Sequence, residues 1–146
     1  MSAPAIDPRT LPPPQPSPDI DTAPFWAATA AGQLQLCRCR SCRRWQQPPL
    51  ERCRRCSGPT AFEPVSGEGT IYTFIVQRQP AVVGYLDGAP YAVALDELDE
   101  QPGLRLPGRV IDIAPGDVCI GLRVRARIEH LPGGDFFVPV FAPATA

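Results

Sequence analysis

Four cysteines stand in two pairs, and this spacing constrains the fold more than any other feature of the chain. Two residues separate Cys39 from Cys42, two separate Cys53 from Cys56, and ten lie between the pairs. Two such turns facing each other can place four thiolates at the corners of a tetrahedron around one Zn²⁺ ion. Because the protein would fill every position around the metal, the pattern predicts a structural zinc ribbon without an open catalytic position.

The cellular setting decides whether such thiols bind metal or form disulfides. The chain starts with neither the basic nor the apolar segment of a secretory signal, and no run approaches the about 20 apolar residues of a membrane span. We therefore expect a cytoplasmic protein, because a reducing compartment leaves thiols free for metal. Disulfide bonds, or thiol exchange by the two pairs, are the alternatives.

Two further cysteines lie outside the pairs. Cys37 precedes the first pair by two residues and can compete as a ligand, although an ordinary buried or half-exposed thiol is the simpler expectation. Cys119 stands between Val118 and Ile120, and this apolar stretch predicts a place in the core.

The basic residues are unusual in kind and in distribution. All 14 are arginine, against 15 acidic residues, so the chain has no overall charge to attract nucleic acid. Half of them lie in the metal-binding segment: Arg38, Arg40, Arg43, Arg44, Arg52, Arg54 and Arg55. Such a patch can meet phosphates, an acidic partner or the negative charge of a metal-tetrathiolate centre.

The chain is expected to begin with an arm and a short helix. Residues 1–20 are rich in proline and predict a disordered arm that neither forms a helix nor buries much surface. Asp21 or Thr22 can cap a helix that Gly32 ends. Phe25 and Trp26 give this helix two large aromatic side chains, which must dock on their own domain or on another chain.

The rest of the chain divides into a ribbon and a barrel, so the predicted fold is mostly β. Residues 21–62 hold the helix and the zinc ribbon, with a lead-in strand at 33–36 and Trp45 in the loop between the cysteine pairs, where it can cover the metal. Residues 63–142 carry turn signals between five short strands, without room for crossover helices, and predict a small OB-fold barrel. These strands are expected at 70–76, 91–95, 109–113, 120–128 and 136–141.

Alternation along two of these strands predicts which side chains face the core. In 70–76, residues 71, 73 and 75 share one face and residues 72, 74 and 76 the other. In 120–128, Ile120 and the apolar residues at even positions share one face, and Arg123, Arg125 and Arg127 share the other. The arginine row is expected to be a solvated outer face, or else a stripe for phosphates or a partner.

The residue types offer little for catalysis. The single histidine, His130, has no cysteine near it in sequence, and the barrel region contains no Ser-His-Asp set. The acidic run Asp96, Glu97, Asp99 and Glu100 is expected to be a solvated loop beside a turn and not an acid/base pair. We predict no catalytic residues in this chain.

The order of these parts resembles one family, the acyl-CoA-associated zinc-ribbon (rubredoxin-like)/OB-fold proteins known as DUF35, over about residues 20–142. The resemblance is carried by segments at 24–26, 32–36, 48–49, 66–72, 90–95 and 120–124 together with both cysteine pairs. Two positions depart from the family pattern. Arg43 stands where a glycine usually follows the first pair, and Leu50 stands where an arginine is expected after Pro48-Pro49.

The resemblance implies an accessory subunit with structural Zn²⁺. Such proteins accompany thiolase-fold enzymes, namely thiolases, acyltransferases and aldolases that cleave steroid side-chain CoA thioesters, and the partner carries the catalytic residues. It implies a heterotetramer in which this subunit supports the enzyme and helps to shape the acyl-CoA site. The residues expected to contact the partner or CoA are Phe25, Trp26, Arg38, Arg40, Arg43, Arg44, Arg54 and Arg55.

An alternative from another class is a single-stranded nucleic-acid-binding protein. A zinc ribbon beside an OB barrel suits that role, and Tyr72, Phe74 and the arginine row of 120–128 can stack on bases and contact phosphates. The near-neutral charge and the absence of lysine argue against it.

Overall fold

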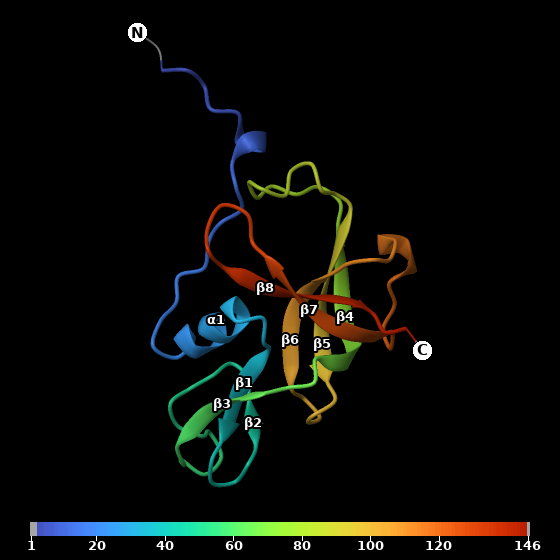
Figure 1. Ribbon diagram of the computed structural model, residues 1–146. Helices are drawn as coiled ribbons and strands as arrows, with labels where there is room; N and C mark the ends of the chain where they lie inside the picture. Colours follow the sequence, from blue (N-terminus) through green and yellow to red (C-terminus); the bar gives the residue numbers. More distant parts are fainter. Residues whose placement is uncertain (1–2, 146) are drawn as a thin grey trace.

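The fold consists of one helix, a small three-stranded sheet and a closed barrel (Figure 1). The computed structural model describes residues 3–145. Its helical elements are η1 (Pro8–Thr10), α1 (Ala23–Ala30) and η2 (Pro115–Asp117). Its strands are β1 (Gln35–Cys39), β2 (Trp45–Gln46), β3 (Thr60–Pro64), β4 (Glu68–Gln77), β5 (Tyr91–Leu98), β6 (Arg105–Val110), β7 (Arg123–His130) and β8 (Phe137–Pro143).

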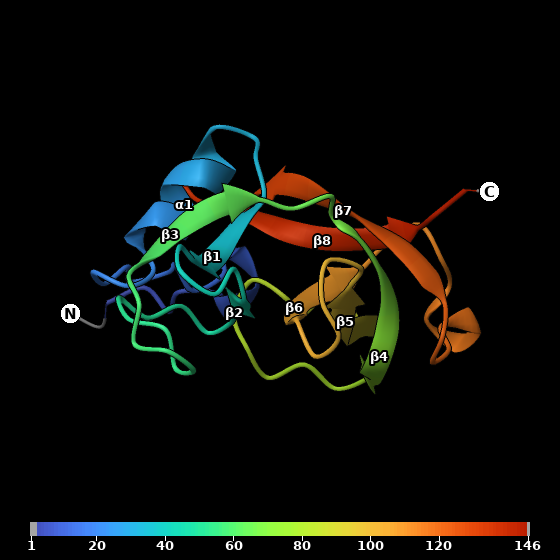
Figure 2. The same cartoon turned by 90° about the horizontal axis from the view of Figure 1, so that it is seen from below.

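The ribbon sheet has the order β2-β1-β3, and both neighbours run antiparallel to β1. The five later strands close into a barrel of order β4-β5-β6-β8-β7, in which only the β6–β8 pair is parallel. Figure 2 shows β3 leading through a short link into the long, curved β4. The predicted mostly β fold, with a four-cysteine ribbon and a five-stranded barrel, is confirmed.

One hydrophobic cluster joins the ribbon to the barrel. Leu34, Leu36 and Trp45 from the ribbon region belong to the same cluster as Ile71 and Phe141 from the barrel. The ribbon therefore covers part of the barrel core, and burial of these side chains stabilises both parts together. The division of the chain at residue 62 stays a prediction.

The helix begins and ends where the sequence indicates. Thr22 is its N-cap, but the Thr22 side chain does not bond to the N–H groups of the helix. Instead, the Asp19 carboxylate accepts hydrogen bonds from both the backbone N–H and the hydroxyl of Thr22. Gly32 follows with φ +77°, a conformation that glycine adopts without steric cost. Phe25 packs against the core. The Trp26 ring meets the Phe25 ring edge-on with centroids 5.0 Å apart, and it meets the Phe136 ring edge-on with centroids 5.5 Å apart.

A β-bulge in β4 corrects the predicted alternation. The pairing of β4 with β5 shifts between Ile71 and Thr73. Ile71 is buried, but beyond the bulge Phe74 and Val76 pack against the core, while Ile75 is 62% exposed. The extra residue moves each later side chain to the opposite face, which a strict period of two cannot anticipate.

The start of β7 corrects two further expectations. The strand begins at Arg123, since residues 115–121 form η2 and a turn in which Gly121 has φ +89°. Ile120 is 68% exposed and Cys119 is exposed, so neither belongs to the core. Val124 and its partners on the same face of β7 do pack inward, as predicted. The third strand of the barrel in chain order, β6, also starts earlier than expected, at Arg105.

Candidate metal centre and the arginine surface around it

Two tight turns bring the four cysteines together. Cys39 ends β1, and its N–H donates to the Arg44 carbonyl at 2.9 Å across the first turn. In the second turn, the Cys53 N–H donates to the Gly58 carbonyl at 2.9 Å. Each turn contains one residue with positive φ, Arg43 at 62° and Ser57 at 59°. This conformation explains why glycine suits the position of Arg43, and it shows that arginine can occupy it.

The sulfur positions fit a single metal ion. The four Sγ atoms all lie within 4.8 Å of one another. The Cys39–Cys56 sulfurs are 3.5 Å apart and the Cys42–Cys53 sulfurs 3.7 Å apart. A tetrahedral site with metal–sulfur bonds of about 2.3 Å needs sulfur separations of about 3.8 Å. The predicted ligand set is therefore assembled, and it suits a metal ion.

Backbone N–H groups point at the sulfurs and favour thiolates. The Cys42 and Ser41 N–H groups donate to the Cys39 sulfur at 3.3 and 3.4 Å, and the Arg55 N–H donates to the Cys53 sulfur at 3.3 Å. The Cys42 N–H is the main cause that lowers the pKa of Cys39 to about 6. Thiolate is the form that binds metal, so these N–H groups favour the binding form of Cys39 and Cys53, whereas contact with the Cys39 sulfur and burial raise the pKa of Cys56.

Cys37 is not one of the ligands. Its side chain is 1% exposed, and its thiol approaches the Leu50 carbonyl at 3.6 Å. Cys37 lies within the strand, whereas Cys39 stands at its end, where the turn that carries the ligands starts. Cys37 is therefore the buried thiol expected from the sequence.

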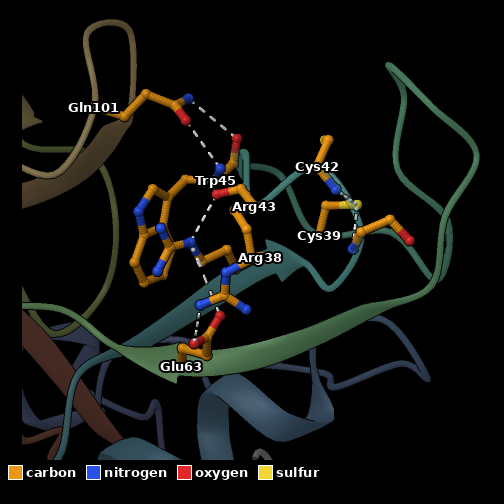
Figure 3. A network of polar contacts seen from close by, with 8 residues as sticks. Arg38, Cys39, Cys42, Arg43, Trp45, Glu63 and Gln101 are labelled. Atoms are coloured by element: carbon orange, nitrogen blue, oxygen red, sulfur yellow. Dashed lines mark hydrogen bonds and ion pairs between the residues drawn. The ribbon is translucent and has the colours of Figure 1, made fainter.

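Trp45 lies on the barrel side of the ribbon, which corrects the prediction that it covers the metal (Figure 3). It is 7% exposed and packs in the shared core. The Arg38 guanidinium stacks on its ring at 4.6 Å from the centroid. Arg38 also donates to the Arg43 carbonyl at 2.7 Å, and Arg43 forms an ion pair with Glu63 at 2.8 Å. These two arginines are held within the ribbon.

Gln101 ties the ribbon to the barrel by both ends of its amide. The Trp45 N–H donates to its oxygen at 2.9 Å, and its nitrogen donates to the Trp45 carbonyl at 3.2 Å (Figure 3). Gln101 lies in the turn after β5, so this pair of bonds crosses between the two sheets.

We expect Gln101→Ala to lower the free energy of unfolding by about 1–3 kcal/mol, because two backbone groups at a half-buried site lose their partners. Chemical denaturation followed by Trp fluorescence measures the change. Gln79→Ala, at an exposed glutamine in the loop after β4, is the matched control and should stay within about 0.5 kcal/mol. Equal effects of the two changes would contradict a bridging role for Gln101.

The remaining ribbon arginines are exposed, and none has a carboxylate partner within the described residues 3–145. They are Arg40, Arg44, Arg52, Arg54 and Arg55. Arg44, Arg54 and Arg55 line a groove of about 440 Å³ beside the second cysteine turn, with Trp45 and Gln101 in its wall. The structure thus concentrates arginines without carboxylate partners at the junction of ribbon and barrel, beside the cysteine cluster.

Comparison with known proteins identifies the family to which this chain belongs. The family described as "ChsH2, C-terminal OB-fold domain" matches residues 62–129. A solved structure titled "Ltp2-ChsH2(DUF35) aldolase" contains a chain that is 30% identical and superposes with a TM-score of 0.81, covering 90% of this chain and 100% of that one. This chain belongs to the DUF35/ChsH2 family.

Two relatives agree with this membership, and a second structure shares the fold. A DUF35 domain-containing scaffold protein of Methanocaldococcus jannaschii is 38% identical over 96 residues, which is 64% of this chain and 66% of that protein. The 3-oxo-4,17-pregnadiene-20-carboxyl-CoA hydratase alpha subunit of Mycobacterium tuberculosis is 33% identical over 118 residues, 81% of this chain but 37% of that protein. A DUF35 protein of unknown function from Sulfolobus solfataricus, 14% identical, shares the fold at a TM-score of 0.56 over 83% of each chain.

The arginine row of this DUF35 protein is neutralised on its own surface. Arg123 forms a two-pronged ion pair with Asp99 at 2.6–2.7 Å. Arg125 pairs with Glu68 at 3.1 Å, and Arg127 pairs with Asp112 at 2.7 Å. The β7 arginine row is therefore an exposed, charge-balanced surface, and its use as a stripe for phosphates stays a prediction.

The aromatic residues of the nucleic-acid alternative are also engaged. Arg105 stacks over the Tyr72 ring at 3.5 Å, and Phe74 packs against the core. Arg105 therefore occupies a face of the Tyr72 ring that remains partly exposed, and Phe74 is half-buried.

The acidic run does not form a solvated loop, which corrects that expectation. Glu97 pairs with Arg105 at 3.0 Å, and the Glu100 carboxylate accepts from the Ser66 N–H. Asp96 is fully buried in β5, and among the described residues neither of its carboxylate oxygens has a hydrogen-bond partner. Burial raises the pKa of Asp96 to about 7. Only the strand's alternation, which places every second residue of β5 inward, signals this position in the sequence.

Phe25 and Trp26 are half-buried against their own chain, and a role for them in a partner interface stays a prediction. Among residues 3–145, no helix has the length and apolar character needed to cross a membrane.

Proposed function

We propose that this chain is a non-catalytic subunit that binds and supports a thiolase-fold enzyme acting on acyl-CoA thioesters, steroid side-chain CoA thioesters among them. The observation that carries the proposal is the likeness to the DUF35 chain of the Ltp2-ChsH2 aldolase, which extends over 90% of this chain. The names of its relatives, a scaffold protein and a subunit of a CoA-thioester hydratase, point the same way. A cytoplasmic heterotetramer of two subunits of each kind is the assembly that we propose.

We assign a structural role to the metal and propose that it is Zn²⁺. Four thiolates at tetrahedral spacing are the ligand set that zinc prefers, and they leave no position for a substrate or water. Zinc bound there holds the second cysteine turn, which carries Arg54 and Arg55 next to Arg44 at the groove. The metal thereby positions the positive surface.

The unpaired arginines are the surface that we assign to the partner or to the CoA phosphates. Arginine is favoured at the buried centre of protein interfaces and binds phosphate oxygens with two parallel hydrogen bonds. Arg40, Arg44, Arg54 and Arg55 are exposed and have no carboxylate partner within residues 3–145, whereas Arg38 and Arg43 act through Glu63 to shape the ribbon. Two of the eight predicted contact residues, Arg38 and Arg43, serve the ribbon itself. We therefore expect the arginines without a carboxylate partner to contribute most to binding of the partner or CoA.

The chain's own chemistry supports an accessory role. Within residues 3–145, His130 contacts the Gly134 carbonyl at 2.7 Å and packs against Phe137, away from any cysteine. Asp96 is sealed in the barrel. These groups do not converge on a site where a substrate atom could sit, so we place the reacting residues on the partner.

Co-expression with the thiolase-like enzymes of the same organism tests the proposal. We expect one of them to co-elute with this chain in size-exclusion chromatography. The double change Arg44→Glu with Arg54→Glu should weaken the complex at least about tenfold, because it reverses charge at the groove. Arg78→Glu with Arg109→Glu, which makes the same charge change at exposed arginines outside the ribbon, is the matched control.

A chain that never co-elutes with any thiolase-like enzyme would overturn the proposed function. Equal weakening by both double variants would leave the partner in place but would overturn the assignment of the arginine groove.

A further inference from the structure

The proline-rich arm lies between two loops of the barrel. It runs past the β4–β5 loop, residues 78–90, and the β7–β8 turn, residues 131–136 (Figure 1). Pro13 is buried, although the prolines on either side of it are exposed. A burial pattern with one anchored residue inside an exposed run is the pattern of a peptide in a groove.

Glycines make room for this segment. A β-carbon at Gly84 would overlap the backbone of Pro13, and one at Gly133 would overlap the ring of Pro12. Both loops therefore approach the arm more closely than any other residue type would allow. Gly84 and Gly133 also have positive φ, 85° and 93°, so the backbone conformations that create the groove depend on glycine as well.

Polar contacts fix the register of the arm. The Gln15 amide donates to the Pro132 carbonyl at 2.9 Å and to the Pro13 carbonyl at 3.0 Å. At the other end of the segment, Arg9 lies 3.8 Å from the Asp87 carboxylate in an exposed ion pair. One side chain thus holds the arm to the turn, and another holds it to the loop.

The β4–β5 loop has little else to fix it. Its backbone bonds are short-range, from Tyr85 to Val82 and from Gly88 to Tyr85, both at 3.2 Å. A long loop with few internal bonds opens easily unless another segment packs on it. Proline residues are suited to do so, because their fixed φ leaves little conformational entropy to lose on docking.

We propose that the β4–β5 loop and the β7–β8 turn form a binding groove for an extended, proline-rich segment, and that residues 11–15, which follow η1, occupy it as a strap that holds the loop against the barrel. The groove recognises one inserted proline, the backbone on either side of it and one glutamine amide. The inference stands independently of the proposed function.

Hydrogen exchange on the full chain tests the strap. Pro13→Ala should speed exchange of the amides in 78–90 at least about tenfold while leaving the strands of the ribbon unchanged, because the buried ring and the fixed φ are lost. Pro18→Ala, at an exposed proline of the same arm, is the matched control and should leave loop exchange unchanged. Unaltered exchange in Pro13→Ala, or equal changes in both variants, would overturn the proposal.

A second experiment separates the groove from the arm. A chain starting at residue 18 should bind a synthetic peptide of residues 5–17, with NMR shift changes confined to 78–90 and 131–136. A peptide carrying Gln15→Ala should bind at least about fivefold more weakly, since the bond to Pro132 is lost. Failure of the peptide to bind the folded, shortened chain would overturn the groove; should that chain not fold, the exchange result alone decides.

Discussion

Replacing Cys53 with serine is expected to unfold the ribbon and to release the metal. The ribbon sheet consists of strands of only two to five residues, too short to persist without a cross-link. Structural zinc contributes about 10–16 kcal/mol to the folding of small zinc domains, so losing one of its four ligands removes most of what holds these turns. Cys53 is 4% exposed, and its replacement also leaves a hydroxyl among the remaining sulfurs.

The effect should extend into the barrel. Leu36 and Trp45 belong to the shared core, so an unfolded ribbon uncovers apolar surface on the barrel and lowers its thermal midpoint. Metal content should fall from about one zinc per chain to near zero, and Trp fluorescence should shift as Trp45 meets water. Limited proteolysis should cleave within 40–58 first.

Cys119→Ser is the matched control, because this cysteine is exposed and outside the cluster. It should keep its zinc and its thermal midpoint. A Cys53→Ser protein that retained metal and resisted proteolysis would show that the other thiols suffice and that the ribbon does not depend on the full set.

Asp96→Asn is expected to stabilise the protein above neutral pH. Burial raises the pKa of Asp96 from 3.8 to about 7. Between these values the folded protein retains a proton that the unfolded chain has lost, so the stability of the wild-type protein falls as pH rises through this window and levels off above about pH 7. A shift of about three pKa units corresponds to about 4 kcal/mol, of which the asparagine should recover a large part at pH 8.

Urea denaturation of both proteins from pH 5.5 to 8.5 measures the difference, and contributions that the two proteins share cancel. The gain should shrink steadily toward the acidic end. Asp99→Asn is the control of opposite sign, because the hydrogen bond from Arg123 lowers the pKa of Asp99. The Asp99 carboxylate therefore stabilises the fold at pH values above its unfolded pKa, and the variant should have a lower free energy of unfolding at neutral pH. A pH-independent gain for Asp96→Asn would show that the carboxylate is solvated in the fold.

Much of the candidate site was predictable because its signals are local. The two cysteine turns need only a few residues each, so their spacing predicts the sulfur cluster that the structure assembles. The helix between Thr22 and Gly32 follows equally from capping and breaking residues next to each other in the chain. The count of barrel strands follows from turn residues that separate short apolar runs.

Two of the errors share one physical cause, which is pairing between residues far apart in the chain. The bulge near Tyr72 reverses the inward face of β4 only because β5 pairs with it in a shifted register. Trp45 turns to the barrel because Gln101, from a distant turn, binds its backbone. Ile120 leaves the core because η2 and its turn occupy the place of the first strand residues.

The sequence by itself determined the four-thiolate cluster, the short helix, the five-stranded barrel and the crowding of arginines near the metal. Only the tertiary structure decided which of those arginines are free. Glu63 holds Arg38 and Arg43, and carboxylates from β4, the turn after β5 and the segment after β6 neutralise the row on β7. An ion pair depends on distances of a few ångströms between side chains from separate strands. Strand register and the folding of the chain set those distances, and composition does not.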